Sequence, residues 1–381
     1  MPKKKVLVWE TLATVSGGQK MTLLVMDLLK ESCAFFCLIP EKGKLSDELD
    51  KRNIPYALMG DQSMPTGVKG KQVVIRYAWL SAKNIILSLV KIATYKPDIL
   101  YAPGPAALPW SAVCGTLTGK KVIWHLHHVF MDGPTKKLLN ICAGWKTVRN
   151  IISVSHYVGD QIVNSAACDK VDVMYNPIDV VKYSSGNPSV IRQLINRMGA
   201  DVGQVEEPSR IVIGHVGLVQ ESKCQDFVLD VIATLRGHGY NAIGLFPGEI
   251  RDCAYLEKLK KQASCLNLDK HVMFLGRRDD IPDILKVLNV LIVPSVEGLS
   301  LAGLEAAAAG VPVVAADVAG AAELVKASGI GLTFKAHSVE AACAAVIDAW
   351  GNAEQYRANA EAYMEKCSDQ AYASKLKQIF E

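Results

Sequence analysis

The chain has 381 residues, of which 50% are hydrophobic and 21% are charged, and its formal net charge is +4. This composition is typical of a folded globular protein and excludes a disordered chain. The length favours two domains of roughly 150–200 residues, each with a core of its own.

Short apolar runs alternate with longer amphipathic segments through the first half of the chain. Strands are predicted at 4–10, 31–40, 72–77, 98–103, 121–127, 150–155 and 171–176. The helices predicted between them include 20–31, 78–95 and 134–145. Strands separated by helices of this length indicate βαβ units and therefore a parallel sheet.

The alternation lapses near Tyr183 and restarts near residue 208. The second series of strands is predicted at 210–217, 241–248, 271–276, 290–295 and 311–317. The expected organisation is an N-terminal Rossmann-like domain (1–185), a linker (186–208), a second Rossmann-like domain (209–355) and C-terminal helices (356–381) that pack back towards the first domain. The predicted fold class is α/β, with two Rossmann-like domains of parallel sheet facing a cleft.

No segment is predicted to span a membrane, because Glu297, Glu305 and Asp317 interrupt the most apolar stretch, 289–320. The start MPKKKVLVWE is interpreted as a first strand and not a signal peptide, so a cytoplasmic location is expected. Residues 1–185 carry 23 Lys and Arg against 14 Asp and Glu, whereas the remainder carries 19 against 24. A basic half fits peripheral contact with an anionic membrane face, although an ordinary solvated surface explains it equally well.

Metal and nucleic-acid sites find little support in the sequence. The ten cysteines form no CxxC pair, and no His/Cys cluster has zinc spacing. Asp279, Asp280 and Asp283 are interpreted as a solvated turn and helix cap. Basic residues are not interleaved with aromatic ones, so no nucleic-acid partner is expected.

The stretch VLIVPSVEGLSLAGLEAAAAGVPVVAAD (290–317) carries the strongest functional signal. A strand ends at Pro294, and a helix is predicted to open at Gly298. Backbone N–H groups at such a helix start form an anion site suited to a diphosphate. Glu297 and Glu305 flank this position, about 10–12 Å apart along the chain axis. Carboxylates suit the site because each can accept hydrogen bonds from two vicinal hydroxyls.

These residues resemble the signature of glycosyltransferase family 4 (group 1), P-S-x-x-E-G-x-x-L-x-x-L-E-A-M-A-x-G-x-P-V-V, with Ala307 in the Met place. The resemblance implies that Glu297 holds the hydroxyls of a donor sugar and that Glu305 holds a ribose. AGAAELV (319–325) is similar to the family's G-G-x-x-E, with Gly320 and Glu323 matching. The backbone amides assigned to the diphosphate are those of Gly298, Leu299, Ser300 and Leu301.

Two further segments resemble the same family. HVGLVQESKCQD (215–226) is similar to V-G-R-L-x-x-x-K-G-x-D, which implies that Gly217 makes a tight turn and that Lys223 neutralises a departing diphosphate. Leu218 stands where the family has Arg, and Cys224 stands where it has Gly. FLGRRDDIPDIL (274–285) resembles the base-binding segment, in which the backbone near Arg277 meets the nucleobase.

The N-terminal half contributes a glycine pair and a histidine. TVSGGQK (14–20) is not G-x-G-x-x-G, which argues against a dinucleotide oxidoreductase. By the resemblance, Gly17 and Gly18 approach donor and acceptor. WHLHHVF (124–130) aligns with the family's T-x-H-D/G, so that His127 is the implied contact to the donor sugar; packing or capping is the plain alternative for each histidine. Zinc is not expected, because His125 and its neighbours lack a fourth ligand nearby in sequence.

The resemblance as a whole implies a retaining, metal-independent hexosyltransferase without a cofactor. The implied co-substrate is a UDP-sugar, with glucose as the best guess, and the acceptor is a saccharide or lipid-linked saccharide of polysaccharide or glycoconjugate synthesis. The implied catalytic residues are Glu297, His127 and Lys223. Two alternatives remain open: a catalytically silent sugar-nucleotide-binding protein, to which Leu218 points, and a nucleotide-sugar epimerase on the same fold.

Overall fold

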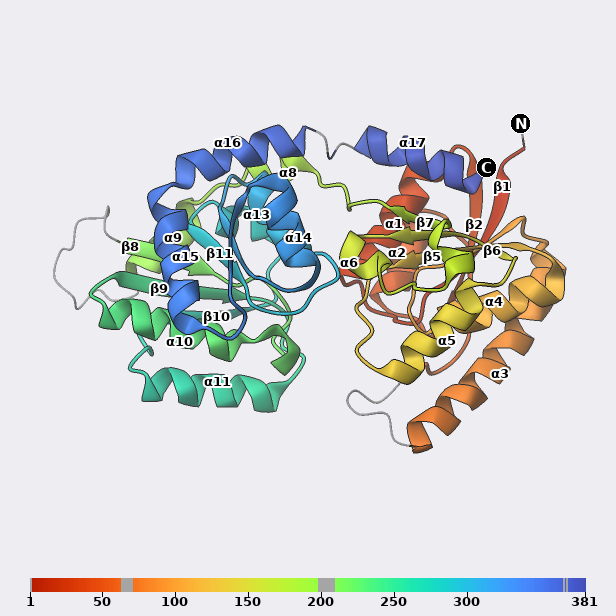
Figure 1. The fold of residues 1–381 in the computed structure, drawn as a ribbon, viewed down its shortest axis with the longest axis horizontal. Helices are drawn as coiled ribbons and strands as arrows, with labels where there is room; N and C mark the ends of the chain where they lie inside the picture. The colour runs from red at the N-terminus through yellow and green to blue at the C-terminus, as the bar shows by residue number, and fades with distance from the viewer. Residues whose placement is uncertain (1, 63–70, 198–209, 366, 368) are drawn as a thin grey trace. The chain divides into compact units, whose positions relative to one another are not determined.

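The computed structural model describes residues 2–62, 71–197, 210–365, 367 and 369–381. Contacts divide the chain into two units. Unit 1 comprises residues 1–176 and 370–381, and unit 2 comprises residues 177–369. Each unit has its own sheet and its own hydrophobic core (Figure 1).

Unit 1 contains a seven-stranded sheet in the order β3-β2-β1-β4-β5-β6-β7, with every neighbouring pair parallel. Helices cover both faces of such a sheet, which is why its strands are continuous apolar runs such as the buried Val6–Trp9 of β1. The strands are β1 (Lys4–Trp9), β2 (Cys33–Ile39), β3 (Tyr56–Leu58), β4 (Ile99–Ala102), β5 (Lys121–Leu126), β6 (Val148–Ser153) and β7 (Val171–Val173).

Two helical layers cover this sheet. On one face α1 and α2 pack on Val6 and Val8. On the other face Trp9 Nε1 donates to Ser88 Oγ of α3 at 2.9 Å, and Figure 1 shows α3, α4 and α5 side by side. The helices are α1 (Gly17–Leu29), α2 (Lys44–Lys51), α3 (Lys71–Tyr95), α4 (Ala107–Thr118), α5 (Gly133–Ala143), α6 (His156–Gly159) and α7 (Ser165–Cys168).

The C-terminal helix α17 (Asp369–Phe380) completes the core of unit 1. Leu376 is fully buried in the hydrophobic cluster that also contains the buried side chains of α1. The ring of Phe380 lies edge-on to the ring of Tyr101, with the ring centroids 5.4 Å apart. The preceding helix α16 (Ala353–Met364) belongs to unit 2. The expected C-terminal segment 356–381 is therefore divided between the two units.

Unit 2 contains a six-stranded parallel sheet in the order β10-β9-β8-β11-β12-β13. The two doubly wound sheets confirm the expected pair of Rossmann-like domains. The strands are β8 (Arg210–Gly214), β9 (Asn241–Pro247), β10 (Val272–Gly276), β11 (Val290–Val293), β12 (Val313–Ala316) and β13 (Gly331–Phe334). The remaining helices are α8 (Val180–Ser184), α9 (Ser189–Arg197), the 3-10 turn η2 (Glu221–Lys223), α10 (Gln225–Gly237), α11 (Cys253–Cys265), α12 (Ile281–Leu285), α13 (Leu301–Ala308), α14 (Ala319–Ser328) and α15 (Val339–Gly351).

The strand predicted at 72–77 is wrong, because these residues belong to the 25-residue helix α3. A β-branched run such as Val73–Ile75 favours a strand locally. The longer segment has a buried face that recurs every four residues, at Leu80, Asn84 and Ser88, and this spacing belongs to a helix. The short strands β3 and β13 were not predicted.

Helix α3 contains one segment that meets the length and composition of a membrane span, whereas no span is expected from the sequence. Gln72–Tyr95 is long and apolar enough by length and composition, with a mean hydropathy of 1.4, and only 17% of its most apolar window is buried. Its inner face nevertheless packs on unit 1: Ser88 accepts a hydrogen bond from β1, and Asn84 Nδ2 donates to Gln62 Oε1 at 2.7 Å. The helix is therefore one layer element of an α/β unit.

The chain leaves unit 1 between Asn176 and Pro177, earlier than the linker predicted at 186–208. Helix α8 already packs in unit 2, and the backbone N–H of Asn187 donates to Asp283 Oδ1 at 2.7 Å. These contacts between residues far apart in sequence displace the boundary. Residues 198–208 of the predicted linker lie outside the described residues.

Candidate functional site

The predicted C-terminal site lies where β8 and β11 end. These two parallel strands are neighbours at the centre of the sheet of unit 2, and the strand order reverses between them. The loops after them therefore diverge from each other. Crevices at such topological switch points are the usual ligand sites of parallel α/β sheets.

An ion pair joins the two loops at this position. Lys223, in η2 after β8, places Nζ 2.7 Å from Oε1 of Glu297, which follows β11. Ser295 Oγ donates to the same carboxylate oxygen at 2.9 Å. The two charged side chains retain 26% and 16% exposure, so both are accessible to a ligand but largely shielded from bulk water. The structure thus brings together two of the residues implied as catalytic.

The Glu297 loop is held by backbone and cap hydrogen bonds. The N–H of Gly320, at the start of α14, donates to the Glu297 carbonyl oxygen at 2.9 Å. Ser300 is buried and caps α13, accepting a hydrogen bond from the N–H of Gly303 at 3.1 Å. The carboxylate therefore stands on a backbone fixed at both ends.

Helix α13 begins at Leu301, three residues later than the predicted opening at Gly298. Gly298 and Leu299 lie in the buried loop before it, and Ser300 is the N-cap. A helix start leaves its first N–H groups without carbonyl partners in the helix. The predicted anion site is thus divided between the loop and the first helical turn.

Glu305 lies in the second turn of α13 and has a partner that the sequence did not suggest. Tyr183 Oη, on α8, donates to Glu305 Oε1 at 2.7 Å. Burial, and then the neighbouring carboxylate, raise the pKa of Tyr183, so the hydroxyl stays a donor at any ordinary pH. Tyr183 orients the carboxylate implied in ribose binding, and it is a site residue that sequence reasoning missed.

His215 is a second missed residue, directly after β8. The ring is buried, and Nδ1 lies 3.0 Å from the carbonyl oxygen of Ile292 in β11. Because a carbonyl only accepts, Nδ1 carries the proton. Burial lowers the pKa of His215 to about 4, so the ring is neutral and its Nε2 keeps a free lone pair; Nε2 has no hydrogen-bond partner among the described residues. The sequence did contain a signal for His215, because it is a polar residue that directly follows a buried strand.

Arg277 follows the edge strand β10, two strands away from β8. Its guanidinium is half exposed and lies 3.8 Å from Glu249 and 3.6 Å from Asp279. No described contact joins it to Lys223 or Glu297. Its part in binding a nucleobase remains a prediction.

Gly217 shows how close a ligand could approach the β8 loop. A Cβ built on Gly217 meets no atom within 4 Å, and its φ angle is not positive, so neither packing nor the backbone conformation requires glycine. A Cβ on Gly248 would lie 1.7 Å from the carbonyl oxygen of Gly217. Gly248 is therefore required for close backbone packing, whereas Gly217 leaves open space that a ligand could occupy.

Substituting these glycines is expected to separate binding from folding. Gly217→Ala should leave the free energy of unfolding within about 0.5 kcal/mol of the native value. If UDP is the ligand, as the sequence resemblance implies, the variant should bind it at least about tenfold more weakly, because the added methyl fills ligand space. Gly248→Ala should destabilise the fold by about 1–3 kcal/mol, because backbone atoms must move. Denaturant unfolding and calorimetry measure both quantities. Unchanged UDP affinity in Gly217→Ala would remove Gly217 from the site.

Cys224, which replaces the family's glycine, adopts a left-handed backbone with φ 55° and ψ 44°. This conformation costs a side-chain-bearing residue about 1–2 kcal/mol. Cys224→Gly is therefore expected to raise the free energy of unfolding by about 1 kcal/mol. Cys265→Gly, at an exposed position of α11 without a positive φ, should gain nothing. A Cys224→Gly variant no more stable than the native chain in denaturant melts would contradict the strain argument.

Gly17, Gly18 and His127 belong to unit 1. Gly17 and Gly18 open α1, and a Cβ on Gly18 would meet nothing within 4 Å. His127 follows β5 and packs on His125, with ring centroids 4.0 Å apart. Burial lowers the pKa of both rings, so both are neutral, and His127 Nε2 has no partner among the described residues. His125 Nδ1 lies 2.7 Å from the hydroxyl of Tyr101, which makes His125 a core residue.

Glu10, directly after β1, is a buried acid that was not predicted. It is 1% exposed and accepts hydrogen bonds from Gln19 Nε2 at 2.9 Å and from Thr22 Oγ1. Burial raises its pKa. Because Gln19 and Thr22 lie in the first turns of α1, Glu10 fixes the start of that helix, where Gly17 and Gly18 lie.

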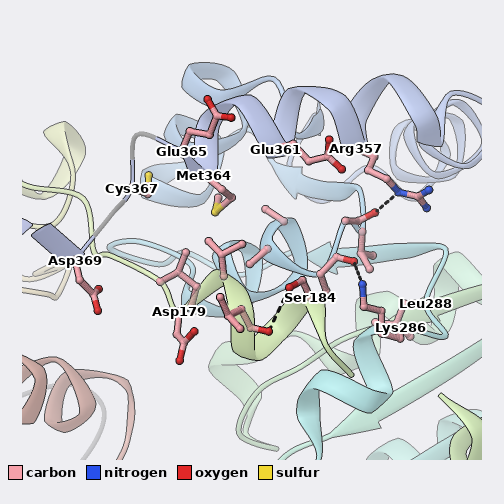
Figure 2. Close-up of a pocket in the computed structure, with 18 residues that line it drawn as sticks. Asp179, Ser184, Lys286, Leu288, Arg357, Glu361, Met364, Glu365, Cys367 and Asp369 are labelled. Atoms are coloured by element: carbon pink, nitrogen blue, oxygen red, sulfur yellow. Dashed lines mark hydrogen bonds between the residues drawn. The ribbon is translucent and has the colours of Figure 1, made fainter. Parts of the chain in front are cut away.

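A cavity of about 980 Å³ in unit 2 lies apart from these residues, at the other end of α13 (Figure 2). Two cations along it hold the C-terminal carbonyls of the helix: Lys286 Nζ donates to Ala309 O at 3.0 Å and Arg357 Nε to Gly310 O at 3.5 Å. Cations stabilise a helix C-terminus in this way. None of the predicted site residues lines this cavity. No group of three or more potential metal ligands occurs in the described part of the chain.

Comparisons with known proteins agree on one family. The model of glycosyl transferases group 1 matches residues 201–366, and that of glycosyltransferase family 4 matches residues 61–182. The chain is 36% identical to the UDP-Gal:alpha-D-GlcNAc-diphosphoundecaprenol alpha-1,3-galactosyltransferase of Escherichia coli over 338 residues, which cover 85% of this chain and 82% of that one. It is 33% identical over 109 residues to the putative glycosyltransferase EpsF of Bacillus subtilis (strain 168), a match that spans 28% of each chain.

The structure of Anabaena Alr3699/HepE in complex with UDP and glucose superposes with a TM-score of 0.80 over 99% of both chains, at 19% identity. Such a likeness shows the fold. Two Rossmann-like domains of this kind define a GT-B protein, and the paired residues lie at the strand switch point of its second domain. The chain belongs to the group 1 glycosyltransferases, of the family 4 type, and it is a glycosyltransferase by this membership.

Proposed function

We propose that this protein transfers a hexose from a UDP-hexose to a lipid-linked saccharide, with retention of the anomeric configuration and at the cytoplasmic face of a membrane. The observation that carries the proposal is the Lys223–Glu297 pair at the ends of β8 and β11. A cation and a carboxylate side by side suit the two ends of a sugar diphosphate. The proposed chemistry uses neither a metal ion nor a cofactor.

Donor binding would exchange the partners of the ion pair. Lys223 would turn from Glu297 to the diphosphate, and Glu297 would accept hydrogen bonds from sugar hydroxyls. The first amides of α13 and the loop amides at Gly298 and Leu299 would add positive potential at the same phosphates. Glu305, oriented by Tyr183, would hold the ribose.

In the proposed reaction the bond from the anomeric carbon to the diphosphate oxygen breaks through an oxocarbenium-like state. The acceptor oxygen forms its bond on the same face, and its proton passes to a leaving phosphate oxygen. Lys223 stabilises the negative charge that develops on the diphosphate. His127, Gly17 and Gly18 are the residues we propose that unit 1 contributes, and the backbone near Arg277 is proposed for the base.

The names of two relatives support the proposed substrates. The E. coli relative is named for UDP-Gal and for a GlcNAc-diphosphoundecaprenol acceptor, and it matches over most of both chains. The Anabaena structure holds UDP and glucose. Glucose, the expectation from sequence, and galactose differ only at C4, and the identity to the E. coli relative favours galactose here.

A catalytically silent sugar-nucleotide-binding protein is the second candidate, because Leu218 removes one of the two cations of the family pattern. Hydrophobic Leu218 cannot share the charge of a leaving diphosphate. In that case Lys223 would bind UDP without accelerating its departure. An epimerase would instead interconvert two UDP-hexoses without any acceptor.

Turnover with three donors tests these alternatives. UDP-galactose, UDP-glucose and GDP-mannose are each incubated with a short-chain polyprenyl diphosphate GlcNAc, with and without EDTA, and UDP release and product are measured. We expect acceptor-dependent UDP release that survives EDTA, and a product whose anomeric proton coupling matches the donor's. UDP binding without turnover would indicate the silent protein, and acceptor-independent conversion of one UDP-hexose into another would indicate the epimerase. Use of GDP-mannose alone would overturn the proposed donor.

A further inference from the structure

The outer face of α3 exposes a stripe of large apolar side chains. Ile75, Trp79, Ile86 and Val90 are each between 56% and 68% exposed. At about 100° per residue these four positions fall within a sector of about 60°, and the stripe runs for about 22 Å along the helix. Scattered apolar residues are ordinary on a protein surface, whereas a continuous stripe marks a contact site.

The inner face of the same helix is partly polar. Asn84 and Ser88 are fully buried, and their hydrogen bonds to Gln62 and Trp9 fix α3 on the sheet. Leu80 and Ile92 are buried on the same inner face, so α3 packs on unit 1 through a mixed apolar and polar face. An ordinary surface helix has its polar side outwards, whereas the outer side of α3 carries a second apolar stripe.

The neighbouring helices extend this surface. Helix α4 packs against both α3 and α5, so the three form one layer (Figure 1). Leu117 on α4 is 63% exposed, and Leu138 and Ile141 on α5 are also exposed. We call the exposed side of these three helices the α3–α5 face.

The charges on the α3–α5 face have one sign. The sequences of α3, α4 and α5 contain no Asp or Glu. Helix α3 carries Arg76 and Lys83 on this side, and α5 carries Lys136 and Lys137. Lys91 of α3 turns instead towards β2, with its ammonium group 5.8 Å from the centroid of the Phe36 ring. Arg76 and Lys83 both lie along one edge of the apolar stripe, and the ammonium group of Lys83 lies 5.8 Å from the centroid of the Trp79 ring. Arg76 also pairs with Asp61, outside the helix, at 3.0 Å.

We propose that the α3–α5 face docks on an anionic lipid bilayer, with Ile75, Trp79, Ile86 and Val90 inserted at the level of the headgroups. An apolar stripe flanked by Lys and Arg is the arrangement of helices that lie in the plane of a membrane interface. Basic side chains near the surface attract acidic headgroups while their aliphatic stems cover apolar surface. The inference deepens the proposed membrane location and is independent of the proposed chemistry.

A lipid surface fits this face better than a second copy of the chain. A two-fold symmetric contact places the same patch on both sides, so the uniformly basic helices would face each other and repel. A bilayer with acidic lipids offers both an apolar layer and opposite charge. An acidic protein partner with an apolar groove is the alternative that the experiment must separate.

Co-sedimentation with vesicles tests the proposal on the full chain. We expect binding to vesicles of phosphatidylcholine mixed with the acidic lipid phosphatidylglycerol and much weaker binding to phosphatidylcholine alone. The double variant Trp79→Gln/Ile86→Gln should lose at least about tenfold in partition coefficient. Lys83→Gln/Lys137→Gln, which removes one cation from α3 and one from α5, should lose acidic-lipid preference and salt sensitivity.

A matched control and independent readouts keep the result specific. Val190→Gln removes an equally exposed apolar side chain from α9 of unit 2 and should bind vesicles like the native chain. Thermal melts and UDP calorimetry should be unchanged in all variants, so that lost vesicle binding is not misfolding or failure of the donor site. Equal binding by native chain and Trp79→Gln/Ile86→Gln, or equal loss in Val190→Gln, would overturn the proposal. Absence of vesicle binding would do the same, whether or not a protein partner is captured.

Discussion

Replacing Lys223 with methionine is expected to lower kcat/KM for sugar transfer by about 10²–10³-fold, because removing one preorganised donor to a developing anion typically costs that much. Lys223 is the cation that the structure places beside Glu297, and Leu218 supplies no second one at the family's Arg position. The loss should also appear in binding of free UDP, since its diphosphate carries the charge that Lys223 meets. Initial rates and UDP calorimetry measure both effects.

The control for this substitution is Lys326→Met, in the last turn of α14, which should change neither rate nor UDP affinity. Lys223→Arg should recover part of the lost activity, because it restores the charge with a different shape. A Lys223→Met variant that keeps native kcat/KM would show that another group neutralises the diphosphate. It would also remove the observation on which the proposed function depends.

Glu297→Gln is expected to lower kcat/KM for the UDP-hexose by about 10²-fold while leaving the affinity for free UDP within a few-fold of native. The amide keeps the shape of the side chain but is a weaker acceptor than a carboxylate for hydrogen bonds from sugar hydroxyls. UDP has no hexose, so it does not use this contact. The opposite pattern of Lys223→Met, which weakens UDP itself, distinguishes the two roles.

Glu257→Gln, exposed on α11 and paired with Lys260, is the matched control and should behave as native. Equal loss of UDP and UDP-hexose affinity in Glu297→Gln would mean that Glu297 acts only by holding Lys223. In that outcome Glu297 becomes a positioning residue, and the contact to the sugar must be sought elsewhere, with His127 as the next candidate. Thermal melts of both variants exclude loss of the fold as the cause.

The sequence by itself determined the fold class and the residue types of the second-domain site. Strand segments buried on both faces, such as Val6–Trp9 of β1 and the whole of β11, are unbroken apolar runs, and such runs are recognisable from the sequence without knowledge of the neighbouring strands. The alternation of these runs with helices predicted both sheets. The pattern after β11 singled out Glu297 because loop, helix start and acid are adjacent in the chain.

Only the tertiary structure decided which of these residues meet. Lys223 and Glu297 are 74 positions apart, and they pair because β8 and β11 are adjacent strands. Tyr183 and Glu305 are 122 positions apart, and their hydrogen bond shows that α8 belongs to unit 2. Sequence patterns report which side of an element is apolar, whereas partners depend on strand order and crossovers that bring distant segments together.

The same limit explains helix α3. Its run of β-branched residues predicted a strand at 72–77, because local preference cannot show which face of a segment will be covered. In the folded unit Asn84 and Ser88 are covered and Trp79 and Ile86 are not. Composition revealed a basic first half, but only the packing of α3 on the sheet placed its apolar side chains outwards. Whether a side chain is buried depends on which helices and strands pack against it. For that reason the sequence by itself determined most helices and strands, while only the tertiary structure decided which of their faces are exposed.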